Sequence, residues 1–271
     1  MSSPFFSIIV PTYQSERTIE SCLNSILTQS FGNFEVIIQD GRSTDNTCDL
    51  VRAFDDARLR LFSEKDNGVY HAMNRAIDKL SGNWVLFLGS DDRLYANETL
   101  ETLKLFLESA KSTDLVYGNV IVAGDSHWIK DGEIYMGETN PVILFDKNLC
   151  QQSILYNKRI FDNGERYNTK YPVLADFDLN LRCFARYRVA YTIQVVSVYY
   201  TGGLSSTSVD KAFAQDKWVN IIRYYRYKLL SPSMIAYKRA LKKAAKQLVK
   251  SGSMRDRITA IAVYLYFKFA K

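Results

Sequence analysis

The chain has few cysteines, and they form no metal-binding pattern. Its four cysteines, Cys22, Cys48, Cys150 and Cys183, lie far apart among 271 residues, and no two of them form a C-x-x-C pair. This spacing excludes a zinc ribbon and a thioredoxin-type motif. Cys22 and Cys48 occupy helix-like apolar positions, so we interpret them as small core residues in a reducing, cytosolic setting.

Targeting signals and long hydrophobic runs are also missing. The N-terminal MSSPFFSIIV lacks the basic flank of a secretory signal, and no run of about twenty apolar residues occurs. We therefore expect a cytoplasmic protein without an ordinary membrane span. No G-x-G-x-x-G follows the first apolar run and no G-x-x-x-x-G-K-[ST] occurs, so a dinucleotide-binding Rossmann domain and a P-loop lose their main support.

Composition is ordinary, but charge is unevenly distributed. Apolar residues make up 47% and charged residues 24%, which is typical of a globular protein and excludes disorder. Residues 206–271 carry 15 Lys and Arg against 3 Asp and Glu, whereas residues 1–205 carry 20 against 26. We expect an acidic body at 1–205 and a basic helical extension at 206–271 whose partner is anionic.

Apolar strands alternate with amphipathic helices along the body. Runs of strand length cover 5–10, 34–39, 58–62, 84–88, 115–122 and 191–200. Helix-like periodicity covers 19–27, 70–80, 96–109 and 176–187, and then 211–230, 234–250 and 255–271 in the extension. Strands that are apolar throughout and separated by helices indicate an α/β fold with a mostly parallel sheet flanked by helices.

Polar side chains follow three of these strands, and carboxyl ends of parallel strands meet at one edge, where ligands bind. The residues concerned are Pro11, Thr12 and Tyr13, then Asp40, then Asp91 and Asp92. Carboxylate oxygens are the ligands that Mn²⁺ and Mg²⁺ prefer, and substrate phosphates fill the remaining positions. This edge therefore suits a nucleotide with a divalent cation, although a solvated turn would also explain the Asp91–Asp92 pair.

A series of motifs in order carries a resemblance over roughly residues 5–206. They are SIIVPTY (7–13), QDGRSTDNT (39–47), SEKDNGVYHAMNRAI (63–77), FLGSDDRLY (87–95), CQQSILYNKRIF (150–161), LADFDLNLR (174–182) and YYTGGLSS (199–206). Together they resemble family 2 glycosyltransferases of the Rossmann-like GT-A fold, of the bacterial type that builds exopolysaccharide and O-antigen repeat units. Arg42, His71 and Gln151 depart from the family pattern and leave the donor sugar open.

The resemblance implies a role for each matching residue. Pro11, Thr12, Tyr13 and Asp40 would hold the nucleoside, and Lys65, Asp66, Asn74 and Arg75 would line the diphosphate region. Asp91 and Asp92 would replace the family's D-x-D motif, with Asp92 as the metal ligand and Asp91 beside the nucleotide. Asp176 would be the catalytic base. Gln151 and Gln152 would lie near the sugar or acceptor.

The implied chemistry is direct displacement. One base opposite one metal-bound leaving group gives inversion at the anomeric carbon. Asp176 and Asp178 both begin a helix, and either could merely favour the helix dipole. Only the motif match favours Asp176. Trp128 is the candidate for stacking on the acceptor sugar, because it lies in the irregular segment 123–150.

The extension contains a basic amphipathic helix. Lys238, Arg239, Lys242, Lys243, Lys246 and Lys250 fall within an arc of about 140°. Residues 258–267 are nearly all apolar and span about 15 Å as a helix, roughly half of a bilayer core. Such a segment lies in a membrane interface rather than crossing it. The alternatives are packing on the body, or nucleic acid, for which no motif accompanies the charge.

The sequence thus predicts an inverting, metal-dependent glycosyltransferase, peripheral on the inner face of the cell membrane. Its donor would be a nucleotide-sugar, with UDP expected. Its acceptor would be a saccharide, expected on a polyprenyl-diphosphate lipid, with no nucleic acid partner. Two alternatives remain open: a non-catalytic, membrane-associated sugar- or nucleotide-binding scaffold, and a nucleotidyltransferase. The latter would require a Gly-rich activation loop near the first strand, and none is present.

Overall fold

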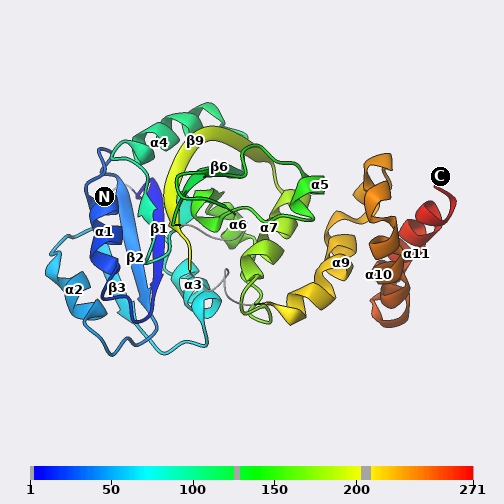
Figure 1. Cartoon of the computed structure of the whole chain (residues 1–271), viewed down its shortest axis with the longest axis horizontal. Coiled ribbons are helices and arrows are strands. Elements are labelled where there is room, and N and C mark those ends of the chain that lie inside the picture. Colours follow the sequence, from blue (N-terminus) through cyan, green and yellow to red (C-terminus); the bar gives the residue numbers. More distant parts are fainter. Residues whose placement is uncertain (1–2, 125–128, 203–208, 271) are drawn as a thin grey trace.

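A curved, mixed β-sheet forms the centre of the body (Figure 1). The computed structural model describes residues 3–124, 129–202 and 209–270. The strand order is β3 (Leu59–Ser63), β2 (Phe34–Asp40), β1 (Phe6–Thr12), β4 (Trp84–Phe87), β8 (Ile154–Asn157), β6 (Leu115–Ala123), β9 (Val189–Tyr200) and β5 (Arg93–Leu94), with β7 (Ile134–Tyr135) paired to β6. Strands β3, β2, β1 and β4 run parallel, and β6 runs parallel to β9. The predicted α/β fold is confirmed.

Helices cover both faces of the sheet, which explains why its strands are apolar throughout. In β1, Ile8 and Val10 pack in the core cluster on one face, and Ile9 packs in the cluster on the other. The first face carries α1 (Ile19–Leu27), α2 (Thr47–Ala53) and α4 (Thr99–Ser109). The second carries α3 (Val69–Ile77), α5 (Pro141–Leu144), α6 (Arg159–Asp162) and α7 (Ala175–Arg186).

Three further helices continue from the second face. They are α9 (Lys211–Tyr225), α10 (Lys238–Ser251) and α11 (Met254–Phe269). The helix expected over 211–230 ends earlier, because Arg226 has a φ of 52°, which an α-helix does not accommodate. The helix expected from residue 234 begins at Lys238, after a 3₁₀ segment that starts at Pro232. Helix α11 begins with a capping box between Ser253 and Asp256.

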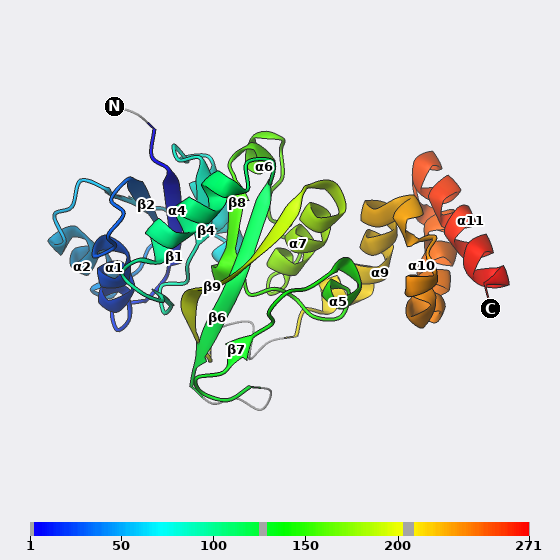
Figure 2. The same ribbon diagram turned by 90° about the horizontal axis from the view of Figure 1, so that it is seen from above.

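Helix α9 joins these last helices to the body. Its residues Phe213, Ile221 and Ile222 belong to the same apolar cluster as α7, and this cluster continues to Leu241 of α10 and Val263 of α11. Both views place α10 and α11 at the end of the molecule opposite α1 and α2 (Figures 1 and 2). We call α10 and α11 the C-terminal arm.

Candidate active site

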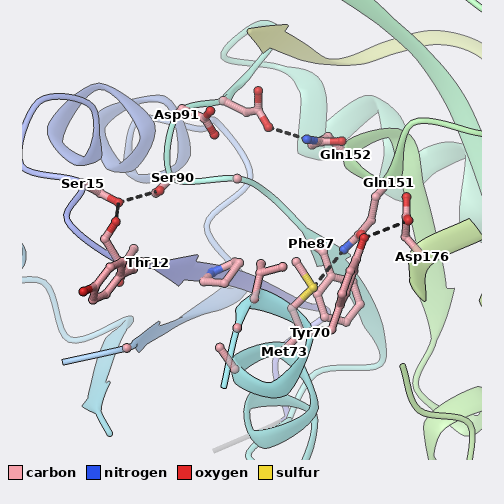
Figure 3. Close-up of a pocket in the computed structure, with 18 of the residues that line it drawn as sticks. Thr12, Ser15, Tyr70, Met73, Phe87, Ser90, Asp91, Gln151, Gln152 and Asp176 are labelled. Carbon is pink, nitrogen blue, oxygen red and sulfur yellow. Dashed lines mark hydrogen bonds between the residues drawn. The ribbon is translucent and has the colours of Figure 1, made fainter. Parts of the chain in front are cut away.

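A large pocket opens at the carboxyl edge of β1, β2 and β4 (Figure 3). Its volume is about 1360 Å³, larger than the roughly 300–1,000 Å³ of most small-molecule sites, so it has room for two substrates. The segments that line it are 11–18, 65–70, 89–92, 148–152 and 173–174, with Gly41, Asp45, Ala72, Met73, Phe87, Tyr135, Asp176 and Tyr199. The hydroxyls of Ser15 and Ser90 lie 2.8 Å apart and join two of these loops. The predicted meeting of strand ends is confirmed.

Two glycines allow the loops to approach each other closely. A Cβ on Gly89 would lie 2.6 Å from Oδ2 of Asp92 and 2.7 Å from Oδ1 of Asp91. A Cβ on Gly41 would lie 2.7 Å from Oδ2 of Asp66. Glycine at these two positions therefore leaves the carboxylates where they are, whereas any side chain would displace them.

Asp92 is buried at the pocket wall with both carboxylate oxygens hydrogen-bonded. Oδ2 accepts a hydrogen bond from Nε2 of Gln152 at 2.5 Å, and Oδ1 accepts one from the Tyr200 backbone N–H at 2.9 Å. Burial, followed by the charge of Asp91, raises the pKa of Asp92 to about 7. Asp91 is exposed as a residue, but the atoms around its carboxylate partly desolvate it and also raise its pKa. Among the described residues, neither carboxylate forms a salt bridge.

This acidic pair fits a divalent cation that is shared with a substrate. In the part of the chain that the structure describes, no group of three or more His, Cys, Asp and Glu side chains gathers around one point. The protein would thus supply only one or two oxygen ligands, Asp92 and Asp91. Mg²⁺ is commonly held by one or two carboxylates plus substrate phosphates. A cation there would also neutralise the two carboxylates, which form no salt bridge within the described part of the chain.

Asp176 lies in the first turn of α7, at a part of the pocket wall separate from Asp91 (Figure 3). Its Oδ1 is 2.9 Å from the Tyr70 hydroxyl, and its Oδ2 accepts a hydrogen bond from Nδ2 of Asn148 at 2.7 Å. Burial raises the pKa of Asp176, and these two hydrogen bonds partly oppose the rise. A carboxylate with a raised pKa is a stronger proton acceptor than an exposed one.

Asp178 lies in the same helical turn but faces away from the pocket. It does not line the cavity, and its oxygens accept hydrogen bonds from Asn220 (3.1 Å), Tyr224 (2.8 Å) and Arg182 (3.1 Å). Arg182 also pairs with Glu165. Asp178 is therefore part of a buried network that attaches α9 to α7. The geometry separates the two aspartates that the sequence could not distinguish by spacing.

We expect Asp178→Ala to lower the free energy of unfolding by about 3 kcal/mol while nucleotide binding persists. The loss arises because Arg182 loses one of its two carboxylate partners, and because Asn220 and Tyr224 lose the hydrogen bonds that they donate to Asp178. Urea denaturation measures the effect. Asp162→Ala, which removes an exposed ion pair with Lys158, is the matched control and should cost less than about 1 kcal/mol. A variant of normal stability without turnover would contradict this role.

Six of the residues assigned to the donor line the pocket directly: Pro11, Thr12, Tyr13, Asp91, and Lys65 and Asp66 from the loop before α3. Tyr13 is 66% exposed and offers its aromatic ring to a ligand. Lys65 is also exposed. These residues supply a ring, a hydroxyl and a cation along one wall, which is a suitable inventory for a nucleoside diphosphate.

Asp40, Asn74 and Arg75 do not line the pocket. Burial would raise the pKa of Asp40, but hydrogen bonds from Ser43 and Ser63 outweigh it and the pKa is lowered. The side-chain amide of Asn74 donates a hydrogen bond to the Tyr167 carbonyl and accepts one from the Tyr167 N–H, both at 2.9 Å. Arg75 contacts Glu64 and the carbonyl of Lys65. In this structure these three side chains support the loops around the pocket.

The two glutamines lie in the pocket on different partners. Gln151 donates to the Tyr167 hydroxyl at 3.0 Å and lies 3.3 Å from Sδ of Met73 (Figure 3), whereas Gln152 contacts Asp92. Trp128 lies outside the described residues. Sequence reasoning missed Tyr70 and Asn148, the two partners of Asp176. Tyr70 lies within a matching motif, which was a usable signal, but Asn148 lies in the irregular segment and had none.

The sheet, the pocket at its carboxyl edge and the acidic pair after β4 define a GT-A glycosyltransferase. The model of glycosyl transferase family 2 matches residues 7–167, and the chain belongs to this family. The solved structure of Staphylococcus aureus TarS residues 1–349 in complex with UDP-GlcNAc has the same fold, with a TM-score of 0.67 and 18% identity over 97% of this chain and 89% of that one.

Curated relatives are also named as glycosyltransferases. The PGL/p-HBAD biosynthesis glycosyltransferase of Mycobacterium bovis (BCG) is 41% identical over 79% of this chain and 84% of its own. The Escherichia coli enzyme WfgD, UDP-Glc:alpha-D-GlcNAc-diphosphoundecaprenol beta-1,3-glucosyltransferase, is 30% identical over 60% of this chain and 58% of its own. The fold of the mannosyltransferase PcManGT from Pyrobaculum calidifontis, in complex with GDP-Man and Mn²⁺, is similar with a TM-score of 0.57 and 19% identity over 99% of this chain and 83% of that one. The chain is therefore a glycosyltransferase.

Proposed function

We propose that the protein transfers a sugar from a nucleotide-sugar to a hydroxyl of a saccharide acceptor, with inversion and with a divalent cation. The observation that carries this proposal is the placement of one carboxylate, Asp176, and of the acidic pair Asp91–Asp92 on separate parts of one pocket wall. A single base opposite the leaving group favours direct displacement. The anomeric carbon would pass through an oxocarbenium-like transition state between the two groups. The pocket would orient the substrates, and no covalent bond to the enzyme would form.

The donor side is the wall formed by the ends of β1 and β4. Thr12 and Tyr13 would contact the nucleoside, and the exposed Lys65 would attract the diphosphate. Asp92, with Asp91 beside it, would hold Mn²⁺ or Mg²⁺. When bound, such a cation supplies Lewis-acid neutralisation of the departing diphosphate. Gln152 and the Tyr200 N–H hold the Asp92 carboxylate in place for this contact.

The acceptor side is the wall around Asp176. Its carboxylate would accept the proton of the attacking hydroxyl as the new glycosidic bond forms. Tyr70 and Asn148 hold the carboxylate in place through Oδ1 and Oδ2, respectively. Each of these oxygens has a second lone pair that can accept the proton. Leu149, Val173 and Leu174 line the same side and would limit the access of water to the reacting atoms.

The relatives' names support the substrate classes. WfgD is named for UDP-glucose and a diphosphoundecaprenol-linked acceptor, and TarS was solved with UDP-GlcNAc. We propose a UDP-sugar as the donor and a saccharide on a lipid, such as a polyprenyl diphosphate, as the acceptor in surface polysaccharide synthesis. The PcManGT complex with Mn²⁺ supports the metal. No observation favours the scaffold or the nucleotidyltransferase.

A donor screen tests this function. The melting temperature is measured with UDP-glucose, UDP-GlcNAc and GDP-mannose, each with and without Mn²⁺. A ligand at 100 times its Kd stabilises the fold by about 2.7 kcal/mol, so a binding donor gives a clear, metal-dependent rise. Release of nucleoside diphosphate then measures turnover. No stabilisation by any nucleotide-sugar with Mn²⁺, together with no turnover, would refute the proposal.

We also propose that the C-terminal arm docks the enzyme on an anionic membrane surface. No helix in the described part of the chain is long and apolar enough to span a bilayer. Helix α11 instead exposes an apolar stripe at helical spacing, from Met254 (75% exposed) to Phe269 (73%), with Ile258, Ile261 and Leu265 between them. Its opposite side, including Val263 and Phe267, is buried.

Basic side chains adjoin this stripe. Arg239, Lys243, Lys246 and Lys250 of α10 are exposed, and Lys238 and Lys242 are half-buried. Lys242 and Lys246 lie over the ring of Tyr264 in α11, and Lys268 lies over Phe269. Cations next to an exposed apolar stripe match the interface of an anionic membrane, where apolar groups insert and basic groups meet the headgroups. We propose that the enzyme is peripheral on the cytoplasmic face.

Reversing Arg239, Lys243 and Lys246 to Glu should weaken binding to vesicles that contain phosphatidylglycerol by about 10²-fold or more. Each basic group near an anionic surface is worth about 1 kcal/mol, and 1.4 kcal/mol is tenfold. Vesicle sedimentation measures it, and turnover with a soluble acceptor should be unchanged. The control reverses three exposed cations of the body, Arg52, Lys111 and Lys130. Equal loss in both variants, or self-association without vesicle binding, would contradict the docking.

A further inference from the structure

A chain of three hydrogen bonds runs from the buried core to Asp176. The Tyr156 hydroxyl donates to Oδ1 of Asn180 at 2.9 Å, and Nδ2 of Asn180 donates to Oδ1 of Asn148 at 2.9 Å. Nδ2 of Asn148 then donates to Oδ2 of Asp176 at 2.7 Å. The donors thus all point in one direction, from β8 through α7 to the pocket. Such chains polarise each member and strengthen the last bond.

This chain fixes which way the Asn148 amide faces. An asparagine can present either its oxygen or its NH₂ group to a neighbour. Because Asn180 donates to the oxygen of Asn148, the NH₂ group must face Asp176. Asn180 and Tyr156 are fully buried, and Asn180 does not line the pocket. Two polar side chains in a closed core give no stability advantage over apolar groups of the same shape.

We propose that Asn148 is a positioning residue for the base Asp176, and that Asn180 and Tyr156 hold the Asn148 amide in its donating orientation. This inference rests on the proposed role of Asp176 as the base. The amide keeps one carboxylate oxygen fixed and stabilises the ionised form, which is the form that accepts a proton. Without the amide, Tyr70 would still donate to Oδ1, but less would oppose burial, which favours the protonated, inactive carboxyl.

The tyrosines and the cysteine near Asp176 stay neutral in the relevant pH range. Those that interact with its charge are Tyr70 on α3, Tyr135 on β7, Tyr156 on β8, and Tyr167 and Cys150 in the adjoining loops. Burial raises the pKa of each of them above its already alkaline value. The carboxylates Asp210 and Asp92 act on Tyr70 and Cys150 respectively. The acidic limb of a pH–rate profile can therefore report Asp176, provided that metal binding at Asp92 is saturated.

The test is the pH dependence of nucleoside diphosphate release from the donor that the screen selects, with water as the acceptor. In Asn148→Ala the acidic limb of the pH–rate profile should move to higher pH. At pH values below the pKa of the base, a shift of one unit lowers the rate about tenfold. The KM for the donor should stay the same. Asn180→Leu, which leaves every pocket residue unchanged, should move the limb in the same direction by less. If it does not fold, Tyr156→Phe replaces it.

Asn119→Ala is the matched control. Asn119 is a buried asparagine that donates to Tyr191 and to the Ile193 carbonyl between β6 and β9, outside the pocket. Its loss should lower the melting temperature without moving the limb. Profiles are repeated at two Mn²⁺ concentrations, because a limb due to Asp92 would depend on metal and one due to Asp176 would not.

Failure of the positioning role of Asn148 can be distinguished from failure of the base role of Asp176. If Asp176→Asn is inactive but Asn148→Ala keeps the wild-type limb and rate, the positioning role is refuted and the base assignment stands. If Asp176→Asn keeps full turnover, the base assignment itself fails. The proposal is supported if the acidic limb moves to higher pH in both Asn148→Ala and Asn180→Leu but keeps its wild-type position in Asn119→Ala.

Discussion

Replacing Asp176 with asparagine should lower the turnover number by about 10²–10⁴-fold, the usual contribution of a general base. Asparagine has nearly the same shape and fills the same place, but it cannot accept a proton at neutral pH. Nucleotide affinity should change little, because the hydrogen-bond partners of Asp176 are Tyr70 and Asn148 rather than Asp92. Steady-state kinetics measure the first effect, and thermal shift with nucleotide and Mn²⁺ measures the second.

The stability of Asp176→Asn shows whether lost turnover reflects the missing base or an unfolded protein. Burial raises the pKa of Asp176, so the folded protein binds this proton more tightly than the unfolded chain does. Stability from this group is present below the unfolded pKa of about 3.9 and is lost as pH rises to the folded pKa. An asparagine side chain does not ionise and carries no such cost, so Asp176→Asn should melt no lower than wild type at about pH 8. Full turnover in this variant, or its loss in Asp178→Asn instead, would contradict the assignment.

The sheet and its helices could be predicted because each element has a strong local pattern. Strands such as 84–88 are apolar throughout only because helices cover both faces, so the pattern itself indicates the layers. The helix ends were harder to predict. Nothing in the periodicity of 211–230 indicates that Arg226 adopts a positive φ, since that conformation depends on how the next segment packs.

The site was predictable where it follows strand ends and not where it depends on distant contacts. Asp92 and Tyr13 follow apolar strands and were expected at one edge. Asp176 and Asp178 share one helical turn, and only the arrival of α9, with Asn220 and Tyr224, decides which of them is buried in a network. Asn148 reaches Asp176 across 28 positions of sequence, a contact that no local pattern encodes.

Asp92→Ala should abolish the metal-dependent part of nucleotide binding and lower turnover by about 10³-fold. A bound cation is worth several kcal/mol of charge stabilisation at the leaving group, and about 1.36 kcal/mol is tenfold in rate. The fold should persist, because the substitution removes a buried carboxylate whose pKa burial raises to about 7. Isothermal titration of UDP with and without Mn²⁺ measures binding, and EDTA should reduce wild-type turnover to the level of the variant.

The neighbouring carboxylate provides the matched control, because Asp91 and Asp92 differ in burial but not in chemistry. Asp92 is 1% exposed and held by Gln152 and the Tyr200 N–H, whereas Asp91 is exposed. A carboxylate that hydrogen bonds already hold in place binds a cation with less loss of freedom than an exposed one, so Asp91→Ala should cost clearly less than Asp92→Ala. Gln152→Leu frees one oxygen of Asp92 and should weaken Mn²⁺ binding without abolishing it. Undiminished turnover of wild type in EDTA would refute the metal role of both aspartates.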